Sequence, residues 1–490
     1  MKDKNKIINS EERFEKVLSE KDIFAIAFGA MIGWGWVILA GYWIRGAGSI
    51  GAMLAFVIAG VMIVFEGLIF AELTSAMPLN GGEQKFSMRA MGKNGSFICT
   101  WGIILSYISV TAFEACALPS VLQYIFPGIL KGYMYTIAGF KVYASWVAIG
   151  SISAFILMMI NIKGAGSAAK LQNILTYIIA GIGIFLIALA VIRGNKVNMH
   201  PFFNNGYKGV LSVAVMTPFM FLGFDVIPQA AEEINVPLKR IGKIMILSIL
   251  MAVVWYVAII FAVSLAMNSK EMGNAVLVTA DAMKKLWNNK QIAADIVIIG
   301  GAAGILTSWN SFFIGGSRAI CALSEAKLIP QKFSKLHPKF KTPYVSILLV
   351  GILSMVAPFF GKQMLTWLTD AGSFGAVVAY FCVALSFALL RKNEPELERP
   401  YKIKYGKFVG TMAILLTGGM LLLYVPGMPS GFSIQEFIIV MGWIALGAVS
   451  YYTSLKGWRK KGYTDEMLFG DIPYYQKKSK KMQNDNTKAI

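Results

Sequence analysis

Two apolar stretches of this chain are interrupted by glycine or proline, and such interruptions free backbone groups that can bind a ligand. The first stretch is residues 29–36 (GAMIGWGW), and the second is residues 217–225 (TPFMFLGFD). A membrane helix leaves backbone N–H and C=O groups unpaired only where they are buried in protein or line a watery cavity. A matched pair of interruptions therefore predicts the binding site of a secondary transporter near the middle of the bilayer.

Carboxyl groups inside apolar stretches are the second chemical signal. Glu66, Glu114 and Asp225 each lie in such a stretch. An ionised carboxylate at the centre of a membrane helix costs about 2.5–3.5 kcal/mol on insertion scales, so each needs a partner or a function. A buried carboxyl group can load and unload a proton near neutral pH. We favour a structural partner for Glu66, whereas proton coupling and a structural hydrogen bond are both open for Glu114 and Asp225.

The composition places these residues in a membrane protein. Of the 490 residues, 56% are hydrophobic and 15% are charged, whereas a soluble domain holds about 25% charged residues. We predict an all-α membrane protein with twelve spans, most of them near the length of about 20 residues that a bilayer requires. These spans are 23–44, 50–77, 96–125, 142–161, 170–192, 209–229, 244–267, 292–316, 344–360, 367–391, 408–426 and 434–455.

The net charge of +20 follows this topology and does not indicate nucleic acid binding. With twelve spans both termini lie on one side, and 35 of the 46 Lys and Arg residues fall on that side, counting Arg318 with the loop after span 8. Such a bias marks the cytoplasmic side. We therefore predict a cell membrane protein, embedded in the lipid bilayer as a monomer or homodimer, with both tails in the cytoplasm and no nucleic acid partner.

The two interruptions fall in spans 1 and 6, which suggests that a unit of five spans occurs twice. Because five is odd, the second unit enters from the opposite face and the repeats are inverted. A short amphipathic helix is expected at 83–91, and the charged C-terminal tail is expected to be disordered. The predicted divisions are a cytoplasmic tail (1–22), two inverted repeats (23–192 and 209–391), spans 11 and 12 (408–455) and a cytoplasmic tail (456–490).

Five short motifs, in order along the chain, resemble those of one superfamily of permeases. They are IGWGWV at 32–37, AEL with MPLNGGE within 71–83, FLGFD with AEEINVP within 221–237, the stretch from 310 to LIP at 328–330, and RP at 399–400. With these motifs the chain resembles the amino acid–polyamine–organocation superfamily over nearly its whole length. The resemblance implies a 5+5 inverted-repeat (LeuT-like) core with broken helices 1 and 6, which moves amino acids or amines by alternating access.

The resemblance also implies that the two broken helices bind the substrate through their backbone. Free N–H groups at Gly33, Trp34 and Gly35 would bind a carboxylate, as the N-terminal ends of helices do. The same glycines could instead serve only close helix packing. Carbonyl groups that would accept from a substrate ammonium lie near Ile32 and in the second interruption, at Phe219, Met220 and Phe221.

Side chains of spans 1, 3 and 8 complete the implied site. Trp34 departs from the small residue usual in the family. Trp34 and Trp36 either make the pocket small, contact a cationic group of the substrate, or simply pack or act as a gate. Glu114, with Thr111 about one turn away, lies on the part of span 3 that faces the substrate. An acid there favours a cationic or amine substrate, or serves as a second proton site. Phe312 matches a pocket-facing aromatic residue of span 8, and ordinary core packing explains it equally well.

The coupling ion is expected to be H⁺, with Na⁺ as the alternative. Asp225 matches an acid that takes part in gating or proton coupling in some relatives. Some relatives carry a lysine in span 5 in place of a sodium ion, and this chain has Ile179 there. Glu72 resembles a family glutamate near the cytoplasmic end and is expected to be a scaffold contact. Hydroxyl groups in membrane helices more often bond to their own backbone, but three in span 8 could supply oxygens to Na⁺, namely Thr307, Ser308 and Ser311.

The function favoured by these residues is secondary active transport of an amino acid or small organic amine across the cytoplasmic membrane, by proton-coupled uptake. A substrate/product exchanger is the alternative, and a membrane sensor that binds its ligand without transport is a third. No nucleophile–base pair, metal-ligand cluster or Walker-type phosphate loop occurs in the sequence. We therefore expect neither an enzyme nor an ATP-driven pump, and no cofactor or metal site.

Overall fold

Helices make up most of the chain in the computed structural model, which describes residues 14–137, 139–275, 277–361, 364–425, 428 and 431–477. Within this part, eight helices of 19 to 43 residues are long and apolar enough to cross a membrane, which requires about 20 residues. They are α4 (Ser49–Ala76), α5 (Glu83–Ile125), α6 (Ala144–Ile162), α7 (Ala165–Arg193), α10 (Leu238–Ala266), α13 (Gln291–Glu325), α15 (Met364–Asn393) and α17 (Ile434–Lys460).

Shorter elements complete the fold. Two further apolar helices are α14 (Tyr344–Val356), which continues as η6 (Ala357–Phe360), and α16 (Gly406–Leu422). One antiparallel hairpin pairs β1 (Tyr133–Ile137) with β2 (Phe140–Tyr143). The other elements are α1 (Glu20–Met31), α2 (Gly35–Ile38), α3 (Ala40–Ala47), η1 (Pro127–Ile129), η2 (Lys196–Met199), α8 (Gly206–Met216), η3 (Thr217–Phe221), α9 (Val226–Gln229), η4 (Ala231–Glu233), α11 (Ser269–Asn274), α12 (Val278–Leu286), η5 (Gln331–Ser334) and α18 (Asp465–Phe469).

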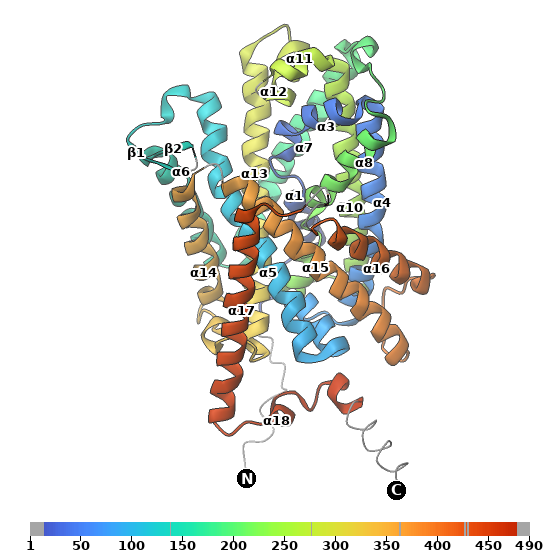
Figure 1. Cartoon of the computed structure of the whole chain (residues 1–490), viewed down its shortest axis with the longest axis vertical. Helices are drawn as coiled ribbons and strands as arrows, with labels where there is room; N and C mark the ends of the chain where they lie inside the picture. Colours follow the sequence, from blue (N-terminus) through green and yellow to red (C-terminus); the bar gives the residue numbers. More distant parts are fainter. Residues whose placement is uncertain are drawn as a thin grey trace.

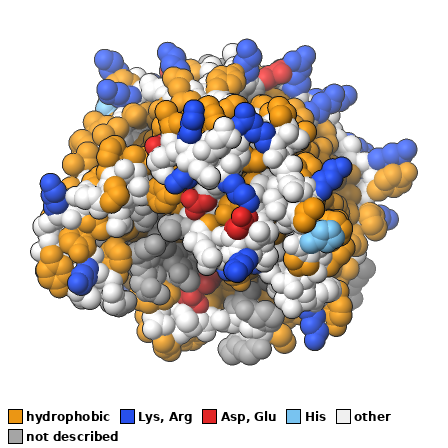
Figure 2. Space-filling model, turned by 90° about the horizontal axis from the view of Figure 1, so that it is seen from above, with side chains coloured by type: hydrophobic (Ala, Val, Ile, Leu, Met, Phe, Trp, Pro, Cys, Tyr) orange, Lys and Arg blue, Asp and Glu red, His pale blue; other side chains and the backbone are white. Residues whose placement is uncertain are grey.

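The long helices run between two opposite ends of the molecule (Figure 1). One end carries α11, α12 and the hairpin, and we call it the α11 end; the other carries α18, and we call it the α18 end. Figure 2 looks onto the α11 end, where Lys and Arg side chains are spread over uncharged surface and a few acidic side chains lie near the middle.

Helical residues occupy all twelve predicted spans, but spans 1 and 6 are divided into short helices. Span 1 becomes α1, α2 and α3, and span 6 becomes α8, η3 and α9. The predicted interruptions are thus real breaks in helical structure. The number of membrane crossings and the inverted repeat stay predictions, because length and composition identify only eight spanning helices among the described residues.

Close backbone contact at glycines holds the long helices together. A Cβ built on Gly102 of α5 would lie 2.8 Å from the carbonyl oxygen of Gly375 in α15, and a Cβ on Gly375 would lie 2.5 Å from that of Gly102. Between α4 and α10, a Cβ on Gly60 would lie 2.4 Å from the Val253 side chain. Small residues at such crossings are the usual basis of helix association in membranes, where lipid removes the hydrophobic driving force.

The start of α5 and the tail pack against each other at the α18 end. The predicted amphipathic helix at 83–91 forms the first turns of α5, which changes direction at Gly92 (φ 73°). A Cβ there would lie 2.7 Å from the Tyr474 ring, the backbone N–H of Lys93 donates to the Tyr475 hydroxyl at 3.0 Å, and the Lys93 ammonium pairs with Asp465. The prediction of a disordered tail is therefore wrong for residues up to 477, because aromatic and charged side chains dock it onto α5.

Candidate functional site

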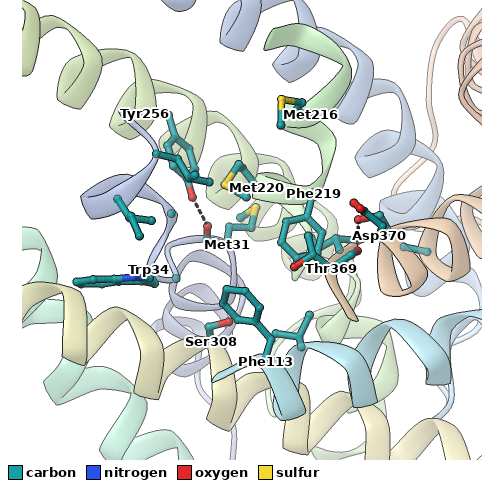
Figure 3. Close-up of a pocket in the computed structure, with 18 of the residues that line it drawn as sticks. Met31, Trp34, Phe113, Met216, Phe219, Met220, Tyr256, Ser308, Thr369 and Asp370 are labelled. Atoms are coloured by element: carbon teal, nitrogen blue, oxygen red, sulfur yellow. Dashed lines mark hydrogen bonds between the residues drawn. The ribbon is translucent and has the colours of Figure 1, made fainter. Parts of the chain in front are cut away.

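The first break lies between α1 and α2. Helix α1 ends at Met31, residues 32–34 are not helical, and α2 begins at Gly35. Within the described residues, the backbone N–H groups of Gly33 and Trp34 form no hydrogen bond. The Met31 carbonyl accepts a hydrogen bond from the Tyr256 hydroxyl of α10 at 2.8 Å (Figure 3). The break thus has a fixed end and two donors available to a ligand.

The second break lies between α8 and α9 and touches the first. A 3-10 turn with Pro218 follows α8. Gly223 adopts φ 131°, a backbone conformation that residues other than glycine rarely adopt. A Cβ on Gly223 would lie 2.3 Å from Cβ of Ala30 and 3.1 Å from the backbone nitrogen of Met31. Glycine therefore permits the two breaks, about 190 residues apart in the sequence, to meet in space.

A cavity of 1450 Å³ is lined by both breaks. Drug-sized ligand sites usually measure about 300–1,000 Å³, so this cavity has room for more than a small amino acid. Figure 3 shows Trp34 of the first break, Met220 and Phe219 of the second, and Ser308 of α13 around one space. The lining continues to the exposed Lys208, so the cavity reaches the surface at the α11 end.

An acidic acceptor stands beside the first break. Glu114 of α5 lines the cavity, and one of its oxygens would lie 3.2 Å from a Cβ built on Gly33. The Ser308 hydroxyl oxygen lies beside it, 3.5 Å from the same Cβ position. Within the described residues, Glu114 Oε2 has no hydrogen-bond partner. Free N–H groups and the carboxyl group of Glu114 thus lie near one another at the first break, which suits a ligand that carries both a carboxylate and an ammonium group.

The two tryptophans of the first break point to different places. The Trp34 indole lines the cavity and packs closely on α13, where a Cβ on Gly301 would come within 2.1 Å of its ring. The Trp36 indole is fully buried and packs edge-to-face on Trp255, with ring centroids 5.6 Å apart. Only Trp34 is therefore placed to contact a ligand in the cavity.

Four more of the predicted substrate-binding residues divide between the wall and the core. Met220 lines the cavity and covers Gly35, where a Cβ would meet its sulfur at 2.6 Å. Phe312 lines the cavity and packs on Tyr107, so it serves both as wall and as core. Phe219 also lines it, whereas Phe221 is fully buried in the aromatic core.

Three predicted residues lie behind the cavity wall. Ile32 is fully buried at the end of α1, and its carbonyl oxygen faces Gly304 of α13. The Thr111 hydroxyl donates to the carbonyl oxygen of Ile108, one turn earlier in α5. Asp225 is fully buried next to the second break, where it accepts hydrogen bonds from the Tyr107 hydroxyl at 2.7 Å and from the backbone N–H of Gly223 at 2.8 Å.

The hydroxyl groups proposed for Na⁺ are separated by their hydrogen bonds. Thr307 donates to the carbonyl oxygen of Gly304 in its own helix, and Ser311 donates to that of Ile26 in α1. Ser308 instead lines the cavity, and like Glu114 it lies beside Gly33. Among the described residues no group of three or more His, Cys, Asp or Glu side chains is placed to hold a metal ion.

A buried amide network ties α1 to α6, α7 and α13, and the sequence analysis does not identify it. Asn161 donates to the side chain of Asn310 at 2.9 Å, and Asn310 donates to Gln172 at 2.9 Å. Gln172 in turn donates to the carbonyl oxygen of Ala25 in α1 at 3.1 Å. The available signal was the presence of three carboxamides inside apolar spans, since buried amides need partners of this kind.

The α18 end of the cavity is closed by polar contacts. Arg318 of α13 forms two hydrogen bonds with Glu233, at 2.8 and 3.0 Å, and both side chains are buried. The predicted loop position of Arg318 is therefore wrong: it lies inside α13. The Glu83 carboxylate at the start of α5 accepts from the Gln229 amide at the end of α9. The backbone N–H of Leu18 donates to the carbonyl oxygen of Glu233 at 2.9 Å, which brings the start of the chain to the same closure.

The two remaining glutamates of α4 behave differently. The scaffold contact predicted for Glu72 is confirmed, because its carboxylate pairs with Arg391 and Arg399 and accepts from the backbone N–H of Ile403. The structural partner predicted for Glu66 is not found: within the described residues neither of its oxygens has a hydrogen-bond partner, and it lines the cavity.

Known proteins resemble this chain over almost its full length. A family model described as amino acid permease matches residues 18–449. The branched-chain amino acid permease BcaP of Bacillus subtilis is 27% identical over 91% of this chain and 94% of its own. The methylthioribose transporter of the same organism is 24% identical over 89% of this chain and 93% of its own. The aspartate-proton symporter of that bacterium is 24% identical over 84% of this chain and 79% of its own.

Proposed function

This chain belongs to the amino acid permease family, and we propose that it carries an amino acid across the membrane by alternating access, with the central cavity as the substrate site. The observation that carries this proposal is the meeting of the two helix breaks on one cavity. Broken helices at a shared cavity are the means by which transporters bind substrates at the bilayer midplane. A membrane transporter of this kind is not an enzyme.

In the proposed complex the substrate lies along the first break. Its carboxylate accepts from the free N–H groups of Gly33 and Trp34. Its ammonium group donates to the unpartnered oxygen of Glu114. Trp34, Met220 and Phe312 would contact its apolar part, since they line the same cavity. The relatives act on substrates as different as branched-chain amino acids and methylthioribose, so the family does not fix the side chain that this cavity accepts.

The proposed transport cycle alternates between two ends of one cavity. The cavity reaches the surface at the α11 end and is closed at the α18 end by the Arg318–Glu233 pair and its neighbours. The positive-inside bias of the sequence makes the α18 end cytoplasmic, so this conformation faces outward. The inverted five-span repeat gives a rigid-body route to the inward-facing state.

Proton coupling is the proposed driving force, with Na⁺ coupling and substrate exchange as alternatives. Glu114 and Asp225 are the candidate proton carriers, because each is a buried carboxyl group at a helix break. The relative that is a named proton symporter makes H⁺ a reasonable choice. Thr307 and Ser311 donate to backbone carbonyls, which leaves the lone pairs of their oxygens able to bind a cation, so Na⁺ stays the alternative.

Uptake into proteoliposomes tests the proposal. The purified chain would be given labelled neutral, basic and acidic amino acids and simple amines, under an imposed pH gradient and with or without Na⁺. We expect accumulation of at least one amino acid that depends on the pH gradient and falls at least tenfold in Glu114→Gln. Uptake that needs internal substrate in place of the gradient would indicate exchange, and no uptake of any amino acid would refute the proposal.

A further inference from the structure

The cavity extends beyond the helix breaks into a side pocket between α4, α15 and α16. Residues of these three helices line it, namely Ile63, Glu66, Val377, Tyr380, Thr417 and Met420. The helices are in direct contact here: one turn beyond Glu66, the Phe70 ring packs edge-to-face on Tyr380 with centroids 5.5 Å apart. Nothing in the proposed binding mode at the first break uses this space.

Glu66 is the acidic group on the α4 wall of this side pocket, to which Tyr380 and Thr417 add hydroxyl groups. Its exposed fraction is 2%, and within the described residues neither carboxylate oxygen has a hydrogen-bond partner. The described ion pairs do not include it. Glu72, two turns further along α4, shows the contrast, because two arginines and a backbone N–H satisfy it. A buried polar group without a partner calls for an explanation such as a ligand or an ion.

We propose that Glu66 is the anionic end of a second subsite, which takes the ammonium or guanidinium head of an amino acid with a basic side chain. This inference rests on the proposed transport of amino acids. Apolar residues Ile63, Val377 and Met420 would pack on the aliphatic stem of such a side chain, and the carboxylate would bind its head. A bare Na⁺ or Ca²⁺ ion fits less well, since a hard cation needs several oxygen ligands and, besides Glu66, the side chains named in this lining offer only the hydroxyl oxygens of Tyr380 and Thr417.

The two glutamates of the cavity would then have separate roles. Glu114 lies beside the free backbone donors of Gly33, where the α-carboxylate and α-ammonium groups are expected. Glu66 lies in another part of the same cavity, on α4. A long basic amino acid can engage both, whereas a neutral one engages only the first. Glu66 is thus a residue that determines specificity and is not required for transport itself.

Kinetics in proteoliposomes with the full chain test this assignment. KM would be measured for leucine, lysine, arginine and the carboxylate-free amine cadaverine, in the wild type, Glu66→Gln and Glu66→Asp. We expect Glu66→Gln to raise KM for lysine and arginine at least tenfold and to leave KM for leucine within twofold, and Glu66→Asp to fall between. The matched control is Val61→Leu, an exposed residue of α4 that does not line the cavity and whose substitution should change no KM by more than twofold.

The outcomes separate this subsite from the proposed function. Equal effects of Glu66→Gln on leucine and lysine, or no effect on either, would overturn the subsite. So would a wild type that transports leucine but neither binds nor carries a basic amino acid, and that result leaves the proposed function intact. Cadaverine transport that depends on Glu66 would show that the head group alone suffices. If no amino acid is carried, the proposed function fails, and binding of arginine by tryptophan fluorescence with and without Glu66→Gln decides the subsite.

Discussion

Gly304 of α13 offers a direct test of how closely the first break must be held. A Cβ built at this position would lie 2.8 Å from the carbonyl oxygen of Gly33 and 2.9 Å from that of Ile32. Both neighbours are backbone atoms, so they cannot rotate away as a flexible side chain would. The substitution Gly304→Ala would therefore force α13 and the broken helix apart by several tenths of an ångström.

The size of the effect follows from this clash. Overpacking in a well-packed core costs about 1–3 kcal/mol. Alanine has a higher helix propensity than glycine, and this difference offsets up to about 1 kcal/mol of the loss in folding stability. If the strain falls mainly on the bound geometry of the break, substrate affinity should drop about 5- to 150-fold, at 1.4 kcal/mol for each factor of ten.

The matched control is Gly181→Ala in α7. This glycine is exposed, and a Cβ there meets no atom within 4 Å. Substrate binding and thermal unfolding would be measured for both variants. We expect Gly304→Ala to lose affinity with the protein still folded, and Gly181→Ala to keep wild-type affinity with equal or higher stability. If the two variants bind substrate alike, the reasoning that places the substrate against the α1–α2 break is refuted.

Three other substitutions separate structural from substrate-facing roles. Arg318→Met should destabilise the closed α18 end by about 3–5 kcal/mol, because it leaves the buried Glu233 without a partner. The midpoint of thermal unfolding should fall, and the double variant with Glu233→Met should regain most of the lost stability. Trp34→Phe should alter substrate KM, whereas Trp36→Phe should lower stability and leave KM within twofold, as uptake and thermal unfolding would show. Lys93 on α5 donates a hydrogen bond to Asp465, and this bond lowers the pKa of the Asp465 carboxyl group below its usual 3.8. The ionised Asp465 carboxylate therefore contributes fully to tail docking at pH values above its usual pKa. This contribution is lost only as the pH falls through the lower pKa that Asp465 has in the folded protein. Proteolysis of the tail should thus be unchanged between pH 5 and 8 in the wild type and faster in Asp465→Asn, whereas a wild-type rate that rises within that range would contradict this account of the pair.

Much of the helical organisation could be predicted from the sequence, because apolar length and interruption by glycine and proline are local properties. The breaks at 32–34 and 217–225 were predictable for this reason. The direction of a side chain at a break is not local. Trp34 and Trp36 are two residues apart and look equivalent in the sequence, but the turn into α2 places one indole in the cavity and the other against Trp255.

The sequence alone also does not show which side chains pair with a buried charged group. Glu66 and Glu72 stand on one helix in similar apolar surroundings, and only the packing of α15 and the loop after it supplies arginines to Glu72. Arg318 shows the converse error. A charge near the end of a span predicts a loop position, but Glu233, from another part of the chain, stabilises the buried Arg318 side chain inside α13.

The central claim is that the transported amino acid binds in the cavity between the two breaks. Substrate protection of a single cysteine at Phe219, in a variant without the four native cysteines, tests it most directly. The account predicts that a membrane-impermeant thiol reagent reaches this cysteine from the α11 end and that the transported amino acid slows the reaction in proportion to its occupancy. Reaction at an unchanged rate in saturating substrate, or only from the α18 end, would contradict it.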